Sequence, residues 1–385
     1  MAFDQKGTTM SDIILSSAIR SNLTSLQSTA HLIGQTQTRL ATGKKVNSAL
    51  DNPINFFTSA SLNARASDLG NLLDGVGNAI QTIQAANNGI TSLTKLVQSA
   101  QAVAQQAQNS AATTATYQGT VSGLTSASSF AVANNNTITV NDGTTTATIT
   151  STGNVTVQQI IDGVNNTASL KVKAELSGDG KILLEATSTN TIVLAGTATA
   201  PEQAQFGLVA GTTAAGTTNT TRSSLATQFD ALRTQIDQLA KDSGYNGVNL
   251  LNGDSLKVVF NELGTASLSV SGVTFSSTGL GVAASTNTFQ TNFDLNAALK
   301  NLSSALGTLR SQASNFGSSL TVVQTRQDFT KSTINTLQVG ADNLVLADTN
   351  EEGANLLALQ TRQQLSTTAL SLAAQAANSV LRLFG

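Results

Sequence analysis

The stretch LSTTALSLAAQAANSVLRLFG, residues 365–385, closes the chain and carries the pattern that decides its fold. No residue between Arg362 and Arg382 is charged, and apolar or small residues recur there at alternating steps of four and three. This spacing predicts a seam, meaning a row of apolar residues along one face of a helix. The seam consists of Leu365, Ala369, Leu372, Ala376, Ser379 and Leu383.

A second row runs beside the first at the same steps, so this helix is apolar on more than one side. Its members are Leu370, Ala373, Ala377, Val380 and Phe384. Burying both rows does not offset the backbone entropy lost when about twenty residues become helical. The tail therefore needs neighbours on several sides, although a terminal helix docked on the chain's own core is the ordinary alternative.

The opposite end of the chain carries a matching seam over residues 11–42. Its members are Ile19, Leu23, Leu26, Ala30, Ile33 and Leu40, with Gln37 interrupting the row. Two terminal seams can pair with each other, and the second row of the tail then stays uncovered. This arrangement favours a subunit of an assembly over a monomer. We therefore expect the assembly interface at Ile19, Leu23, Leu26, Ile33, Leu40, Leu365, Leu372, Val380, Leu383 and Phe384.

Composition excludes several classes of function. The chain has 385 residues, only 11% of them charged, and a net charge of −2, so it lacks the electrostatic footprint of a protein that binds nucleic acid or anionic membrane. It has no cysteine and only two prolines, Pro53 and Pro201. These absences exclude disulfides and thiolate chemistry, and they suit a chain that crosses a narrow channel unfolded and then folds quickly. They suit an ordinary cytosolic protein as well.

Two long seams and one change of composition divide the middle of the chain. A coiled-coil register runs from Leu62 to Ala104 after a helix start at Asn52 and Pro53, and another runs from Leu295 to Leu337. Between them, residues 118–220 are rich in Thr, Asn and Gly. Alternating segments at 137–149 and 170–186 predict two hairpins around a short helix at 155–164.

The fold class expected is therefore mainly α with an inserted α+β domain of ββαββ type. Long antiparallel coiled-coil helices come from both termini, and short strands at 256–260 and 267–273 form a further hairpin. The expected segments are a disordered extension at 1–9, with Met10 as an alternative start to Met1, an N-terminal inner helix at 10–43, the first part of a rod domain at 44–117, the insert at 118–220, the second rod helix and hairpin at 221–290, the last rod helix at 291–340, and a C-terminal inner helix at 341–385.

Candidate catalytic and ligand-binding patterns all fail. His31 is the single histidine, so neither a catalytic triad nor a histidine-ligated metal centre can form, and a packed or interface histidine is expected. The Gly43–Lys45 stretch lacks the first glycine and the Ser or Thr of a phosphate loop. Asp342, Asp348, Glu351 and Glu352 do not have calcium-loop spacing and predict helix-end charge instead. We expect no cofactor and no metal.

Four stretches resemble the bacterial flagellins. Arg39–Asp51 is similar to the family's N-terminal motif, Gln81–Gln101 to its first long rod helix, Tyr245–Leu251 to the segment before its rod hairpin, and Ala347–Leu381 to its C-terminal motif. Their order matches as well. The insert resembles the hook-IN motif, but it precedes the second rod helix, whereas flagellins commonly place variable domains after the hairpin.

The resemblance implies a structural, extracellular subunit of the flagellar filament, exported unfolded by the flagellar type III apparatus. It implies as partners other flagellin subunits, the filament cap, hook-associated proteins and an export chaperone on the C-terminal helix, with no nucleic acid and no membrane. A hook-filament junction protein is the alternative. An enzyme carried by the insert is a remote one, since the insert contains no histidine.

Overall fold

The computed structural model describes residues 17–383, and within them the chain divides into two compact units. The first unit comprises the residues up to 74, residues 261–263 and the residues from 328 onward; the second comprises 75–260 and 264–327. The expected extension at 1–9 lies outside the described residues. The boundaries of the seven expected segments remain predictions.

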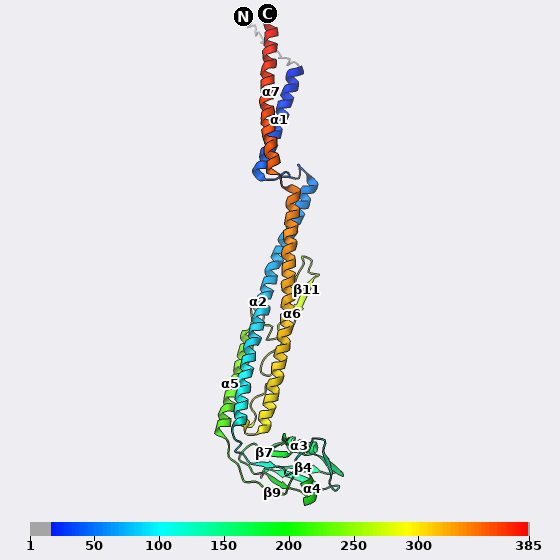
Figure 1. The fold of residues 1–385 in the computed structure, drawn as a ribbon, viewed down its shortest axis with the longest axis vertical. Helices are drawn as coiled ribbons and strands as arrows, with labels where there is room; N and C mark the ends of the chain where they lie inside the picture. Colours follow the sequence, from blue (N-terminus) through cyan, green and yellow to red (C-terminus); the bar gives the residue numbers. More distant parts are fainter. Residues whose placement is uncertain (1–16, 384–385) are drawn as a thin grey trace, which may run out of the picture. The chain divides into compact units, whose positions relative to one another are not determined.

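Seven α-helices and eleven strands make up the described chain (Figure 1). The helices are α1 (Ser17–Thr42), α2 (Pro53–Asn109), α3 (Val157–Asn165), α4 (Ala200–Gln205), α5 (Thr220–Asp242), α6 (Asn292–Val345) and α7 (Thr349–Leu383). The strands are β1 (Thr116–Gln118), β2 (Ser129–Ala131), β3 (Thr137–Asn141), β4 (Thr146–Thr150), β5 (Asn154–Thr156), β6 (Val172–Leu176), β7 (Ile182–Ala186), β8 (Val193–Ala195), β9 (Gly211–Thr212), β10 (Leu256–Val259) and β11 (Ser267–Val270). The expected class, mainly helical with antiparallel sheets in a middle insert, is confirmed.

Helix α2 begins where its sequence predicts. Pro53 is its first residue, and the Asn52 side chain accepts the backbone N–H of Asn55 at 3.0 Å, so Asn52 caps the helix. In the second unit, the residues of α2 that lie on the predicted coiled-coil register are buried, and so is a neighbouring row of alanines. Both rows join α5 and α6 in one core that includes Ile83, Phe229 and Leu302.

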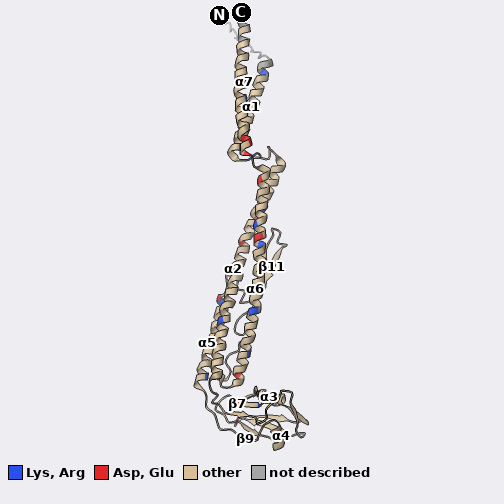
Figure 2. Cartoon of the chain, in the orientation of Figure 1, with Lys and Arg blue, Asp and Glu red and all other residues tan. Residues whose placement is uncertain are grey.

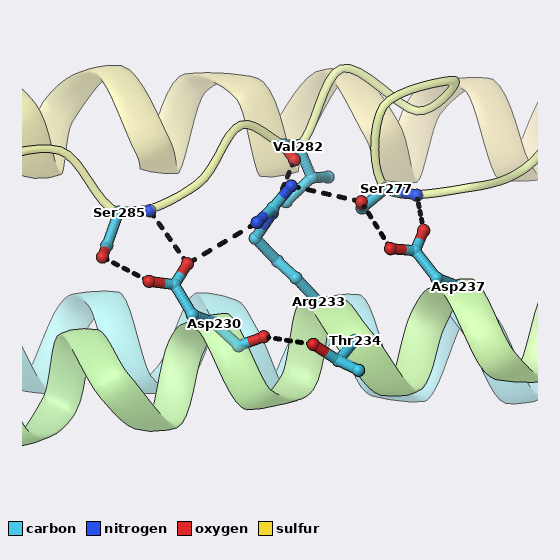
Figure 3. Close-up of polar contacts among 7 residues, drawn as sticks. All are labelled: Asp230, Arg233, Thr234, Asp237, Ser277, Val282 and Ser285. Carbon is cyan, nitrogen blue, oxygen red and sulfur yellow. Dashed lines mark hydrogen bonds and ion pairs between the residues drawn. The ribbon is translucent and has the colours of Figure 1, made fainter.

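Residues 274–286, which precede the short 3₁₀ turn η1 (Asn287–Phe289), run along α5. They are held there by α5 side chains spaced three and four residues apart (Figure 3). Asp237 accepts the N–H and hydroxyl of Ser277 at 2.6 and 3.1 Å, and Asp230 accepts the same two groups of Ser285 at 2.9 and 2.6 Å. Between them, Arg233 donates to the carbonyl of Val282 at 2.9 Å. The four-residue spacing of Asp237 and Lys241 favours a pair along the helix, but the oxygens of Asp237 bind Ser277 instead.

The insert is more elaborate than the ββαββ pattern expected from sequence. The β3–β4 and β6–β7 hairpins and α3 lie where predicted, and the capping box of Thr156 and Gln159 starts α3. Strands β1, β2, β5, β8 and β9 and helix α4 were not predicted. They extend the hairpins into sheets of order β1-β7-β6 and β4-β3-β8-β9 and a β2-β5 pair. Strand β9 lies in the Gly- and Thr-rich stretch at 211–221, whose composition is typical of a linker.

Asp142 fixes the turn of the β3–β4 hairpin to the rest of the insert. Its carboxylate accepts the N–H groups of Thr144, Thr145 and Lys171 at 2.8, 2.7 and 2.7 Å. Burial opposes ionisation, but the hydrogen bonds from Thr145, Lys171 and Thr144 outweigh it and lower the pKa of Asp142 from 3.8 to about 2. Because the folded-state pKa is depressed, this stabilisation is present above pH 3.8 and is lost as the pH falls toward 2.

Replacing Asp142 by Ala should destabilise the insert by about 2 kcal/mol, because buried N–H groups lose a charged acceptor. Hydrogen exchange of residues 137–176 in the full chain should accelerate. The variant should be less acid-sensitive than the wild type between about pH 4 and pH 2, where Glu202 of the insert, whose pKa is also lowered to about 2, still titrates. Asp179→Ala, in the exposed turn of the β6–β7 hairpin, is the control and should leave exchange unchanged. Equal effects of the two substitutions would contradict this account.

Candidate assembly surface

The terminal helices α1 and α7 lie side by side and antiparallel in the first unit (Figure 1). Half-buried residues of α7 recur at steps of three and four where it packs on α1. We call these residues the inner row of α7: Leu356, Leu359, Gln363, Ser366, Leu370 and Ala373. The matching residues of α1 are Asn22, Leu26, Thr29, Ile33, Thr36 and Leu40. The helices therefore pair along one mixed row each.

A second row of α7 is exposed. We call it the outer row: Leu357, Ala358, Leu365, Ala369, Leu372 and Ala376. Leu357, Leu365 and Leu372 are 67%, 66% and 62% exposed. Figure 2 shows α7 largely without charged residues beyond its first turn. Nothing in the described chain covers this row, and full burial of each leucine would regain about 1–2 kcal/mol.

The expected interface residues therefore fall into two groups. On α1, Ile33 is buried, and Ile19, Leu26 and Leu40 are half-buried. Of these, Leu26, Ile33 and Leu40 face α7 and hold the helix pair together. Leu23, Leu365 and Leu372 are exposed. Val380 and Leu383 belong to α7, and Phe384 lies outside the described residues.

Two details of the expected pairing are wrong. The sequence suggested that the row of Leu365 and Leu372 pairs with α1 and that the row of Leu370 stays uncovered, whereas the structure shows the reverse. On α1, the buried places are taken by Thr29 and Thr36, at 2% and 6% exposure, whereas Ala30 and Gln37 of the expected row are exposed. The hydroxyl of Thr29 donates to the carbonyl of Ser25 at 2.8 Å, which satisfies it inside the interface. The seven-residue spacing of these threonines is the signal that could have found them.

The loops at the base of the helix pair are joined by backbone hydrogen bonds. Lys45 N donates to Val345 O at 2.7 Å and Ala347 N to Gly43 O at 2.9 Å. Gly43 ends α1 with a φ of +69°, a left-handed conformation in which glycine carries no penalty. Lys44 and Lys45 are exposed.

Asp51 and Asp348 act as local caps. The N–H groups of Ser48 and Asn47 lower the pKa of Asp51, whose carboxylate accepts both at 2.9 and 3.0 Å. Asp348 accepts the N–H of Asn350 at 2.9 Å at the start of α7, which confirms helix-end charge there. No group of three potential metal ligands occurs within residues 17–383.

His31 is exposed on α1, so it is not a packed core residue. It lines a groove of about 490 Å³ together with Gln35, Thr38 and Asp51. Its alternative role as an interface residue stays a prediction. In the part of the chain that the structure describes, no helix is long and apolar enough to cross a bilayer.

These features define a class of protein: a mainly helical chain whose terminal helices pair and keep an apolar row uncovered. Comparison with known proteins identifies it further. Residues 13–143 match the bacterial flagellin N-terminal helical region, and residues 299–384 match the bacterial flagellin C-terminal helical region. The chain belongs to the bacterial flagellin family, whose members are structural proteins of the extracellular flagellar filament and not enzymes.

Individual relatives agree with this assignment. The chain is similar to flagellins FljM and FljK of Caulobacter vibrioides, with 36% and 35% identity over 162 residues, which is 42% of this chain and 59% of each relative. It is 29% identical over 189 residues to a flagellin of Brucella melitensis, covering 44% of this chain and 65% of the relative. The chain thus spans less than two thirds of the length of these relatives. The insert is not identified by these comparisons.

An ion pair at the base of the helix pair tests how much α1 and α7 depend on each other. Arg39 Nη1 lies 3.0 Å from Glu352 Oε1, and the Glu352 side chain is only 9% exposed. Arg39→Met would leave this carboxylate without its cation and should cost about 1–2 kcal/mol. Hydrogen exchange at 346–356 should accelerate.

The control is Arg65→Met in the same unit. Arg65 pairs with Glu262 at 2.9 Å but is 60% exposed, so its loss should change exchange around residue 262 by less than about 0.5 kcal/mol. Unchanged exchange at 346–356 in Arg39→Met would show that the pair does not tie the helices together.

Proposed function

We propose that this chain is the subunit that polymerises into the flagellar filament, and that copies associate through the surfaces of the first unit. The observation that carries the proposal is the distribution of exposed apolar side chains. Of the large apolar residues found exposed in the described chain, all but Val209, Tyr245 and Val322 belong to the first unit.

The exposed apolar residues of the first unit extend beyond the outer row of α7. Leu50, Ile54 and Phe57 are 96%, 78% and 63% exposed at the start of α2 and lie three and four residues apart. Phe329 and Val339 are exposed near the end of α6, and Leu263 is 83% exposed between β10 and β11. Apolar surface gathered in this way marks an interaction site. Other copies of the chain are suitable partners for this surface, because in a homopolymer each subunit covers the same apolar surface of its neighbour.

The expected interface residues fit this mechanism in two roles. Leu26, Ile33 and Leu40 keep α1 on α7, and Leu23, Leu365 and Leu372 meet neighbouring copies. Val380, Leu383 and Phe384 extend the same two rows of the tail. The filament cap and hook-associated proteins would meet these surfaces at the ends of the polymer.

Export by the flagellar type III apparatus, with a chaperone on the C-terminal helix, belongs to the same proposal. The outer row of α7 offers such a chaperone an apolar helix face that must stay covered before assembly. The chain has no cysteine and only two prolines, and this composition suits a chain that is unfolded for export. A hook-filament junction protein would share the exposed rows but would not elongate.

The proposal is tested by Leu372→Asp, which places a charge in the outer row. The purified full chain should form long filaments in a salting-out buffer, as seen by electron microscopy and sedimentation, since such salts strengthen apolar association. Leu372→Asp should reduce the polymer by at least about tenfold, because burying an unpaired carboxylate is costly. Its helical circular dichroism should stay unchanged, because Leu372 is 62% exposed in the single chain.

Ser371→Asp is the matched control. It adds the same charge one residue earlier, on the exposed polar side of α7, and should polymerise. Filaments of normal length in Leu372→Asp would refute the outer row as an interface. Wild-type protein that binds filament ends without elongating would favour the junction alternative.

A further inference from the structure

The insert touches the start of α6 through a buried carboxylate. Glu185 of β7 is 1% exposed, and its Oε2 accepts the N–H groups of Asn292 and Phe293 at 2.6 and 3.4 Å. These are the first two residues of α6. The third, Asp294, donates its N–H to the hydroxyl of Thr291 at 3.1 Å. The free N–H groups of the α6 terminus are thus shared between its own cap and a side chain of the insert, and the helix dipole favours a carboxylate there.

A left-handed turn precedes this helix start. Asn287, Thr288 and Phe289 have φ values of 46°, 50° and 58°. Single left-handed residues are common for Gly and Asn, but three in succession are rare, and Thr and Phe are poorly suited to the conformation. Thr288 is exposed, so its side chain gains little packing in return. Backbone strain of this kind persists only where surrounding contacts impose it.

Contacts from α5 impose the turn. The Phe289 ring is buried edge-on against Phe229, with centroids 5.1 Å apart. Arg222, 1% exposed, donates to the carbonyl of Gln290 at 2.9 Å and to the carbonyl of Ser110 at 2.7 Å. Its guanidinium also reaches the Asn292 side chain at 2.9 Å. Arg222 therefore joins the end of α2, the turn and the first residue of α6.

The segment that leads into the turn is fixed to α5 by hydrogen bonds. Ser277 and Ser285 are tied to Asp237 and Asp230 on α5 (Figure 3). A change of φ at any of the three left-handed residues cannot be absorbed upstream, so it must reorient the N–H groups of Asn292 and Phe293. The bonds from these groups to Glu185 then break.

We propose that Glu185 and the left-handed turn form a conformational latch between the insert and the helices. While Glu185 caps α6, the turn is held left-handed and the insert is docked. When Glu185 leaves, the turn relaxes and the insert moves on its two connections to α2 and α5. The position of the insert and the conformation of the α6 start therefore change together.

Charged groups around Glu185 make the latch sensitive to pH. Burial raises the pKa of Glu185 above its ordinary value. The hydrogen bonds from the N–H groups of Asn292 and Phe293 and the charge of Arg222 lower it, and the neighbouring Glu175 raises it, so the net shift is upward. Burial also raises the pKa values of Glu175 and of Asp294, which faces Lys173. Since a carboxyl with a raised pKa in the docked state binds its proton more tightly there, docking takes up protons. The latch should tighten as the pH falls through the raised pKa of Glu185 toward the ordinary value of 4.5.

The first test measures the insert directly in the full chain as a monomer. Because the chain has no cysteine, Thr148→Cys in the insert and Thr308→Cys on α6 take spin labels at two unique exposed positions. The distance distribution between them should be narrow in the wild type and at least about twofold broader in Glu185→Ala. Amide exchange at 287–293 should accelerate about tenfold in the same variant.

Two controls separate the latch from general damage. Glu175→Ala removes a neighbouring carboxylate that contacts α6 only through the Asn296 side chain, at 3.2 Å, and should leave the distribution narrow. Glu185→Gln keeps the shape of the side chain, so it folds even if Glu185→Ala does not. It should shrink the pH dependence of exchange at 287–293.

The strain is tested at Thr288. Thr288→Gly should slow exchange at Asn292 and Phe293 about threefold, because glycine adopts a positive φ without penalty. Thr286→Gly, at an exposed residue with a φ of −93°, should speed it instead. The latch is wrong if Glu185→Ala keeps a narrow distribution and unchanged exchange, or if both glycine variants accelerate exchange alike. These results are independent of whether the chain polymerises.

Discussion

Close approach of backbones around α2 is the constraint on which the second unit depends. Ala79, Ala86, Ala100 and Ala107 are at most 3% exposed and recur at multiples of seven, so α5 and α6 can pack against a surface of small side chains. Gly89 belongs to the same surface. A Cβ there would lie 2.6 Å from Leu251 Cδ1 and 2.5 Å from Ser243 Oγ, so a larger residue would force these two side chains of the 243–251 turn to move. The leucines of α6 then fill the remaining space without exposing a row of their own.

The long helices and the two hairpins of the insert follow from the sequence because their periodicity extends over many residues. The buried row from Leu62 to Ala104 and the alternation in β6 are examples. Strands of two or three residues, such as β1 and β9, are too short to show alternation, and their pairing depends on partners distant in sequence. The left-handed turn is also invisible in the sequence, because Asn-Thr-Phe has no composition that favours it. Tertiary contacts from Arg222 and Phe229 determine it.

The assembly surface was predictable in kind but not in detail. Two apolar rows on the tail follow directly from the positions of its leucines and alanines. Which row faces α1 does not, because the rows differ little in composition and the choice depends on what α1 offers. There, Thr29 and Thr36 satisfy the interface with small side chains, and Leu23 is left outside. A pattern built only from apolar residues does not predict that Thr29 and Thr36 are buried. Their spacing of seven residues does.

The two units differ in how far their apolar rows are buried within the single chain. In the second unit the apolar rows are covered within the chain, and buried polar groups such as Glu185, Arg222 and Asp142 find partners there. The first unit keeps whole apolar rows exposed. The helical core of the second unit can therefore form in a single copy. The first unit gains most of its missing burial from other chains, so its order depends on their concentration, whereas the order of the second does not.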